Sequence, residues 1–173
     1  MLRLEIPNTS HHKMYDVAIV ELEREWIEAL NPASTFSYRD WNYSELLERE
    51  TLVQLWKVEW LVPAHTFFCV HQEEQEIVWA IQIRHHINHP NLIHRWGHIG
   101  YGMLPSHRRK WYATKMLCLA LWEAKKIGLD KVLITCDTDN IASKKVIERN
   151  NGILESKESD KKWKEFYRYW ITL

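Results

Sequence analysis

A run of three positive charges, Arg108 to Lys110, stands directly before a helical pattern that begins near Tyr112. Backbone N–H groups in a first helical turn have no partners inside the helix, and together with the helix dipole they attract anions. The order of strand, proline-marked turn, basic cluster and helix start therefore indicates a pyrophosphate site. A charge run can also be an ordinary solvated face, and on these residues alone both interpretations stay open. Neither a P-loop pattern nor a GxGxxG fingerprint occurs in the chain.

Trp111 occupies the point of this turn at which a close approach to phosphate favours the smallest residue. The chain contains ten Trp and only five Gly. Average usage predicts roughly a dozen Gly in a chain of this length. An aromatic-rich core would account for these counts on composition alone, but it does not account for a tryptophan inside the turn.

Five histidines lie close together in the sequence and could transfer protons or bind a metal. They are His85, His86, His89, His94 and His98. Adjacent residues of a strand point to opposite faces, so His85 and His86 do not readily share one ion. We therefore expect no metal site, and for each histidine an ordinary surface or core role stays open.

The composition predicts one compact domain that spans residues 1–173. The hydrophobic share of 46% is enough to close a core at this length. Lys plus Arg and Asp plus Glu total 23 each, so no overall charge demands a nucleic-acid or anionic-membrane partner. The three cysteines form no CxxC pair, and no apolar run approaches the roughly 18 residues that cross a bilayer. We expect a soluble, cytoplasmic protein with reduced thiols.

Alternation and helical spacing predict an α/β protein with one mixed, mostly antiparallel sheet flanked by helices. The expected helices cover residues 11–30, 43–56, 112–127 and 140–152. The expected strands cover residues 2–6, 65–71, 77–87, 97–104, 131–137 and 165–173. The apolar stripe of the third helix stops at Gly128, a natural helix end. Three consecutive strands with short connections indicate an antiparallel meander, which a strand–helix–strand crossover follows.

The segment from GHIGYGMLPSHRRKWYATKML through KVLITCDTDNIASKKVIERNNGILES resembles the GNAT superfamily of N-acetyltransferases. In that family an [RQ]xxGx[GA] turn binds the pyrophosphate of coenzyme A, and Arg108 and Ala113 match the ends of the motif. The resemblance extends from about Val62 to Trp170 and is strongest to a branch of predicted bacterial acetyltransferases. It implies the GNAT acyl-CoA N-acyltransferase fold, with the coenzyme A-binding core at about residues 97–152.

The resemblance implies acetyl-CoA as the co-substrate, with its pantetheine arm in a gap between the fourth and fifth strands. The implied coenzyme-binding residues are Gly102, Met103, Leu104, Arg108, Arg109, Lys110, Trp111, Tyr112, Ala113, Thr114, Asn140 and Ser143. The N–H of Met103 is the expected donor to the thioester carbonyl. A plain helix cap is the alternative role for Asn140.

In the resembled family a free amine attacks the thioester directly. Neutralising a lysine-like amine at pH 7 costs roughly 4–5 kcal/mol, so a base or a water relay must help. Relatives often place Glu where this chain has Gly97, and the catalytic candidates here are His98, His85 and Tyr101. The Tyr that often protonates the leaving thiolate corresponds to Ile147. A thiol pKa of about 8.5 nevertheless makes thiolate a tolerable leaving group.

Trp79 and Trp96, like Trp111, stand where the resembled branch has glycine. Replacing the smallest residue by the largest is not how cores repack, because overpacking costs about 1–3 kcal/mol. We hypothesise that the gene comes from an organism that reads UGA as glycine and that UGA was translated here as tryptophan. The alternative is that the tryptophans are genuine and the site is altered.

The leading expectation is an N-acetyltransferase that acetylates a primary amine of a small-molecule or amino-acid-like acceptor, without nucleic-acid or membrane partners. A homodimer is left open. One alternative is a non-catalytic coenzyme A binder, or a protein of this fold whose site is impaired by Trp111 and Ile147. A binding module of unrelated function is the other.

Overall fold

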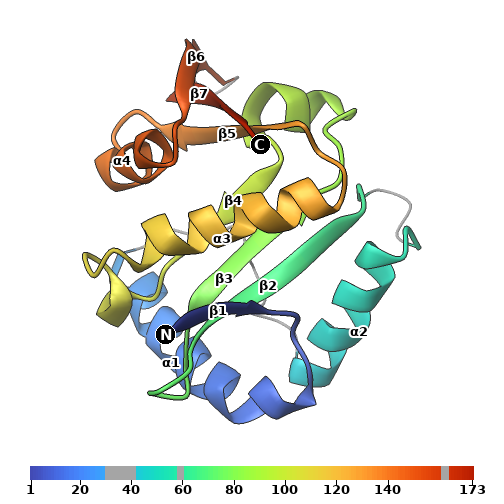
Figure 1. Cartoon of the computed structure of the whole chain (residues 1–173). Coiled ribbons are helices and arrows are strands. Elements are labelled where there is room, and N and C mark those ends of the chain that lie inside the picture. Colours follow the sequence, from blue (N-terminus) through green and yellow to red (C-terminus); the bar gives the residue numbers. More distant parts are fainter. Residues whose placement is uncertain (30–41, 58–60, 161–163) are drawn as a thin grey trace.

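The computed structural model describes residues 1–29, 42–57, 61–160 and 164–173, and in them seven strands form two antiparallel sheets (Figure 1). The first sheet has the spatial order β1 (Leu2–Glu5), β2 (Ala64–His71), β3 (Glu76–Arg84) and β4 (Ile99–Tyr101). The second has the order β5 (Lys131–Asp137), β7 (Glu165–Thr172) and β6 (Ile153–Ser159). The α-helices are α1 (His12–Ala29), α2 (Tyr43–Gln54), α3 (Tyr112–Lys126) and α4 (Ile141–Arg149).

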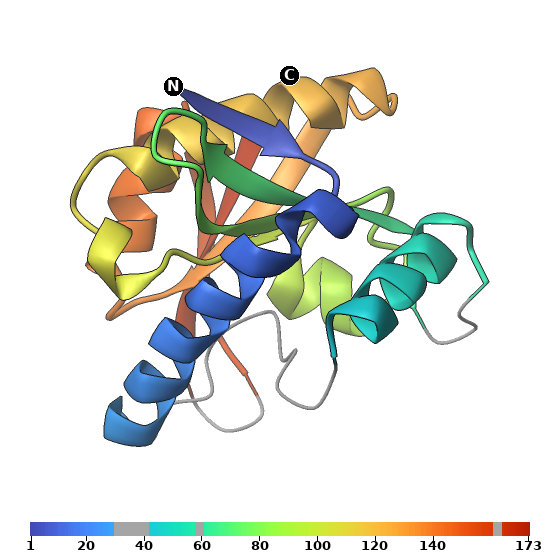
Figure 2. The same ribbon diagram turned by 90° about the horizontal axis from the view of Figure 1, so that it is seen from below.

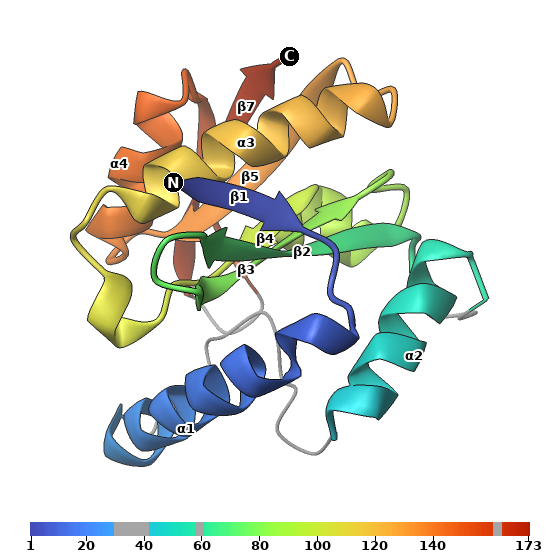
Figure 3. The ribbon, with the colours of Figure 1, turned by 60° about the horizontal axis from the view of Figure 1, so that its bottom comes forward.

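Helices cover both faces of the first sheet. Alternate residues of β2 belong to different cores: Phe67 and Cys69 pack with α3, whereas Phe68 and Val70 pack with α1 and α2. Figures 2 and 3 show the strands between α3 on one side and α1 with α2 on the other. The crossover helix α3 follows β4 in the chain and leads into β5, so it connects the two sheets.

The predicted α/β architecture with antiparallel strands and flanking helices is confirmed, but two details differ. The single sheet of the prediction is two hydrogen-bonded sheets, which separate between β4 and β5. β6 has no counterpart among the predicted strands, because none of its side chains is buried and ILESKES carries no alternating pattern. The predicted end of the first helix at residues 31–32 lies outside the described residues.

The described helices include none that is both long and apolar enough to cross a membrane. Cys69, Cys118 and Cys136 are all free thiols, as their spacing predicts. Burial raises the pKa of Cys69 to about 12 and that of Cys136 to about 11, so both thiols stay protonated near neutral pH.

Candidate active site

β4 and β5 meet at His98 and separate beyond it. The backbone N–H of His98 donates to the carbonyl of Leu133 (2.7 Å), and the N–H of Leu133 donates to Nδ1 of the His98 ring (2.9 Å). Gly97 has a φ of 63°, and a Cβ there would lie 2.3 Å from the Leu133 oxygen, so only glycine fits. No other backbone hydrogen bond joins these two strands in the described part of the chain. A gap therefore begins just after His98.

The backbone N–H of Met103 faces this gap. Gly102 donates its N–H to Ala80 (3.1 Å) and Leu104 donates its N–H to Val78 (3.1 Å), so both groups point toward β3. Successive N–H groups of an extended chain alternate in direction, which turns the Met103 N–H to the opposite side. Within the described residues it has no hydrogen-bond partner. It is thus a donor available to a group that enters the gap.

The N-terminus of α3 is the second feature of the site. Trp111 is the N-cap residue of this helix, and its side chain accepts no hydrogen bond from the first turn. The first backbone hydrogen bond of the helix runs from the Lys115 N–H to the Trp111 carbonyl (3.2 Å). The N–H groups of residues 112–114 therefore point out of the helix end, where the dipole favours an anion. Nε of Arg108 donates to the Met103 carbonyl (3.3 Å) and ties this turn to the gap. The turn that the sequence predicts to bind an anion thus lies at a helix N-terminus without a side-chain cap.

Side chains around the turn are mostly basic and accessible. Arg109 and Lys110 are exposed, and Arg109 has a φ of 60°. The indole of Trp111 is 65% exposed and lies against Arg149, whose guanidinium carbon is 4.2 Å from the ring centroid. The indole therefore lies outside the turn, while the backbone of Trp111 keeps a left-handed conformation with φ 65° and ψ 1°.

Tyr101 and Ser143 meet beside the gap. The Tyr101 hydroxyl and the Ser143 hydroxyl are 2.8 Å apart, which joins β4 to the first turn of α4. Oδ1 of Asn140 accepts from the Ser143 N–H (3.0 Å), so Asn140 is the N-cap of α4, the alternative that its sequence position leaves open. Burial raises the pKa of Tyr101, which keeps the phenol protonated and able to donate.

His98 and His85 lie away from the Met103 amide. Trp79 is opposite Met103, since its neighbours on β3 bond Gly102 and Leu104, and His85 lies six residues further along β3. At about 3.3 Å per residue this separation is about 20 Å, and the corresponding value for His98 along β4 is about 16 Å. The structure thus brings Tyr101, and neither histidine, to the Met103 end of the gap.

The partners of the two histidines indicate structural roles. Nδ1 of His98 accepts from Leu133, and burial, with the nearby charges of Arg84 and His86, lowers the pKa of His98 to about 4. A ring that is neutral and already accepting at Nδ1 carries its proton on Nε2, which leaves no nitrogen free to act as a base. His85 stacks on His65, with 2.6 Å between Nε2 of His85 and Nδ1 of His65.

An ion-pair cluster at the end of β5 was not among the predicted site residues. Asp137 pairs with Arg95 and with Lys164, and the Lys164 contact is 2.5 Å long. The hydroxyl of Thr135 donates to the Arg95 carbonyl, and Arg168 donates to the carbonyls of two residues in the π-helical turn Leu92–Trp96. These contacts hold the segment before β4 against β5 and β7. In the sequence, Asp137 at the end of the KVLITCD strand is the one residue that indicates an ion pair here.

The histidines between residues 85 and 98 do not gather into a metal-type cluster. Over the described residues, the set of side chains that could share an ion consists of Glu74, Glu76 and His107, whose ligand atoms lie within 4.8 Å of one another. Both nitrogens of His107 already have partners, Nε2 with Glu76 (3.2 Å) and Nδ1 with the Ser106 hydroxyl (2.8 Å). We assign these residues to the packing of the turn before α3.

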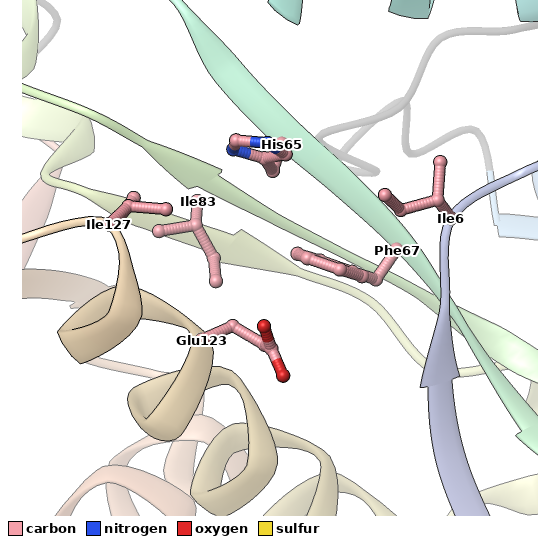
Figure 4. Close-up of a pocket in the computed structure, with 6 residues that line it drawn as sticks. All are labelled: Ile6, His65, Phe67, Ile83, Glu123 and Ile127. Atoms are coloured by element: carbon pink, nitrogen blue, oxygen red, sulfur yellow. The ribbon is translucent and has the colours of Figure 1, made fainter.

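A cavity of about 120 Å³ lies between β2, β3 and the C-terminal half of α3 (Figure 4). Its lining residues are Ile6, His65, Phe67, Ile83, Glu123 and Ile127. Glu123 is eleven residues after Tyr112, which is about 17 Å along the helix. The cavity is therefore remote from the N-terminal end of α3.

Comparison with known proteins shows which family the chain matches and which structures share its fold. The family model described as "Acetyltransferase (GNAT) domain" matches residues 25–152. The structure of the Salmonella typhimurium acetyltransferase that modifies the N-terminal serine of ribosomal protein L7/L12 is 17% identical, with a TM-score of 0.69 over 99% of this chain and 95% of that one. Ribosomal-protein-S5-alanine acetyltransferase from Vibrio fischeri is 16% identical, with a TM-score of 0.73 over 99% of this chain and 92% of that one.

A third similar structure contains the co-substrate. The microcin C7 self-immunity acetyltransferase MccE, in complex with acetyl-CoA and AMP, is 15% identical, with a TM-score of 0.68 over 99% of this chain and 92% of that one. At these identities the likeness shows a shared fold. No curated protein matches the chain.

Proposed function

The chain belongs to the acetyltransferase (GNAT) domain family and is by that membership an acetyl-CoA-dependent N-acetyltransferase, and we propose that it acetylates a primary amine of a small-molecule or amino-acid-like acceptor. The gap between β4 and β5 supports the use of acetyl-CoA, because an unpartnered Met103 N–H faces it and a helix N-terminus without a side-chain cap follows it. A cytoplasmic location and a homodimer stay predictions.

The residues present fit the phosphate end of coenzyme A. The N–H groups of residues 112–114 have no partners within their helix, and Arg108, Arg109 and Lys110 supply positive charge beside them. Because the Trp111 indole lies outside the turn, it leaves the N–H groups uncovered. We assign the pyrophosphate to this end of α3 and the pantetheine arm to the gap.

The Met103 N–H is suited to the acetyl end of the co-substrate. Attack by the amine nitrogen on the thioester carbon forms a C–N bond and places negative charge on the carbonyl oxygen. A donor that is already oriented stabilises that charge without reorganisation, and one such donor is worth about 10²–10³ in rate. The C–S bond then breaks and coenzyme A leaves as a thiolate.

Tyr101 and Ser143 are our candidates for the proton that the thiolate takes up. The resembled family often uses a Tyr at the position of Ile147, which is fully buried here and cannot donate. Ser143 lies one helical turn before Ile147 on α4, and the Tyr101 phenol reaches it from β4. A neutral phenol at this place donates to a thiolate through the Ser143 hydroxyl or directly.

Deprotonation of the acceptor amine is assigned to water. His98 has no free acceptor nitrogen, and His85 lies about 20 Å along β3 from the residue opposite Met103. A water relay, or binding of the amine in its neutral form, then supplies the free electron pair.

The test is release of free thiol from acetyl-CoA across a panel of primary amines, measured together with calorimetric binding of coenzyme A. The panel contains amino acid amides, polyamines and short peptides with a free N-terminus, since acetyltransferases of this fold act on spermidine and on ribosomal proteins. Turnover of a small amine in preference to the peptides supports the proposal. Turnover of peptides alone replaces the acceptor class with a protein N-terminus.

A second candidate function rests on Ile147, which stands where the resembled family often has its proton donor and cannot donate. Its loss favours a coenzyme A-binding protein with weakened or absent turnover, whereas the strained Trp111 turn would weaken coenzyme A binding itself. Calorimetric binding without thiol release from any amine identifies this case.

A further inference from the structure

Three tryptophans have backbone conformations that favour glycine. Trp56 has a φ of 61°, Trp79 a φ of 141° and Trp111 a φ of 65°. A side chain with a Cβ rarely adopts such values, and for a bulky residue they are outliers. We infer that the natural polypeptide carries glycine at positions 56, 79 and 111, encoded by UGA codons that its source organism reads as glycine.

Trp56 follows the C-cap of α2, and the end of α3 shows which residue type is favoured at the corresponding position. There the N–H of Gly128 (φ 88°) donates to Lys125 (3.0 Å), and the N–H of Leu129 donates to Ala124 (3.2 Å). This pair of bonds defines the Schellman motif, in which the left-handed residue after the C-cap is usually Gly and sometimes Asn.

The C-terminal ends of α4 and α2 have the same pair of backbone hydrogen bonds. At the end of α4 the left-handed residue is Asn151 (φ 64°), which donates to Glu148 (3.1 Å), while Gly152 donates to Ile147 (3.0 Å). At the end of α2 the N–H of Trp56 donates to Val53 (3.3 Å), and the N–H of Lys57 donates to Leu52 (2.9 Å). One motif thus ends three helices, with Gly, Asn and Trp at the same position. The tryptophan is the residue that does not suit it.

Position 79 is a strand irregularity in which glycine is favoured. The register between β2 and β3 shifts beside Trp79, which marks a β-bulge. The Trp79 side chain is almost fully buried, and its Nε1 has no hydrogen-bond partner in the structure. Its Cδ1 also lies 2.8 Å from the place where a Cβ on Gly102 would be. The strained backbone and the buried, unbonded indole nitrogen each cost free energy, and glycine removes both costs, while neighbouring side chains must then fill the space of the indole.

Other tryptophans are suited to their positions. Nε1 of Trp170 donates to Glu155 (2.9 Å), and Nζ of Lys131 lies 4.6 Å from its ring centroid. Trp122 lies inside α3 with its side chain 65% exposed. Trp96 has no positive φ, so the structure gives no support for glycine there. Trp41, Trp60 and Trp163 lie outside the described residues.

Glycine at these positions changes the candidate site. At position 111 it removes the backbone strain from the turn to which we assign the pyrophosphate. At position 79 it frees space beside Gly102, on the strand segment that carries the Met103 N–H. The inference does not depend on the acetyltransferase proposal, because it rests on backbone conformation and packing alone.

The direct test is to read the codons and to measure peptide masses of the protein purified from its source organism. We expect UGA at positions 56, 79 and 111, UGG at Trp170, and peptides whose masses contain Gly at the three positions. UGG codons at these positions, or peptides that contain Trp there, overturn the inference.

A second test measures unfolding and needs no activity. The side chains of Trp56, Trp111 and Trp122 are exposed to 66%, 65% and 65%, so Trp122→Gly is a matched control. We expect Trp56→Gly and Trp111→Gly each to raise the folding equilibrium constant, by about 5- to 30-fold, and Trp122→Gly to lower it. If the chain with all its tryptophans does not fold, each tryptophan is restored singly in the triple glycine variant. A loss of stability in Trp56→Gly and Trp111→Gly, as in the control, contradicts the inference.

Discussion

The hydroxyls of Tyr101 on β4 and Ser143 on α4 are joined by a 2.8 Å hydrogen bond beside the gap between β4 and β5. We expect Tyr101→Phe to lower kcat for acetyl transfer by about 100-fold, the low end for general acid catalysis, because thiolate is a tolerable leaving group. The Kd of coenzyme A should stay unchanged. Steady-state thiol release and calorimetry measure the two quantities.

The control for this variant is Tyr167→Phe, since Tyr167 packs against Lys144 through its ring, which Phe retains. Ser143→Ala should give a smaller loss than Tyr101→Phe if the phenol donates directly, and an equal loss if the proton passes through Ser143. An unchanged kcat in Tyr101→Phe would remove this pair from the mechanism.

Local patterns made part of this structure predictable. The apolar stripe ending at Gly128 locates α3, and the basic cluster locates the turn before it to which we assign the pyrophosphate, because both signals depend on neighbours within a few residues. β6 lacks such a signal, since its side chains face solvent on both sides. The bounds of a helix or strand could therefore be predicted from the sequence where one face of that element is buried.

The contacts that assemble the site join residues far apart in the chain. His98 holds β4 to β5 through Leu133, 35 residues later, and Tyr101 meets Ser143, 42 residues later. Nothing in the sequence near His98 distinguishes a ring that accepts a backbone hydrogen bond from one that acts as a base. Only the register of the strands shows that His85 lies far from Met103.

Gly97→Ala should destabilise the protein far more than Gly128→Ala. Both glycines have positive φ, which costs an L-residue about 1–2 kcal/mol. A Cβ at position 97 also meets the Leu133 oxygen at 2.3 Å, whereas a Cβ at position 128 has open space around it. We expect an additional loss of about 2 kcal/mol or more at position 97, from separation of β4 and β5. Chemical denaturation of both variants measures the difference, and equal losses would contradict the role given to this contact.

Acid should lower the free energy of unfolding through protonation of His98. Its pKa is lowered to about 4 in the folded state, against 6.5 for an unperturbed His, so the unfolded chain binds the proton more tightly. The stability from this group is present above pH 6.5 and is lost as the pH falls from 6.5 toward 4, by about 3 kcal/mol at most. His98→Asn retains an acceptor for the Leu133 N–H and does not titrate. Its unfolding free energy should depend less on pH between 7 and 5 than that of the unmodified protein, and parallel curves would exclude His98 as the source.

Arg108→Gln should weaken coenzyme A binding about 10- to 100-fold, the value of one hydrogen bond to a charged group. Arg108 bonds the Met103 carbonyl through Nε and lies at the turn where the N–H groups of α3 are open, so we expect its charge to act on the phosphates. The matched control is Lys126→Gln, which removes a positive charge at the opposite end of the same helix, about 20 Å away. Calorimetry at low and at high salt separates the two cases: the Arg108 effect shrinks with salt because the lost interaction is electrostatic. If Lys126→Gln weakens binding as much as Arg108→Gln, the phosphates respond to net charge alone, and the N-terminus of α3 is not their site.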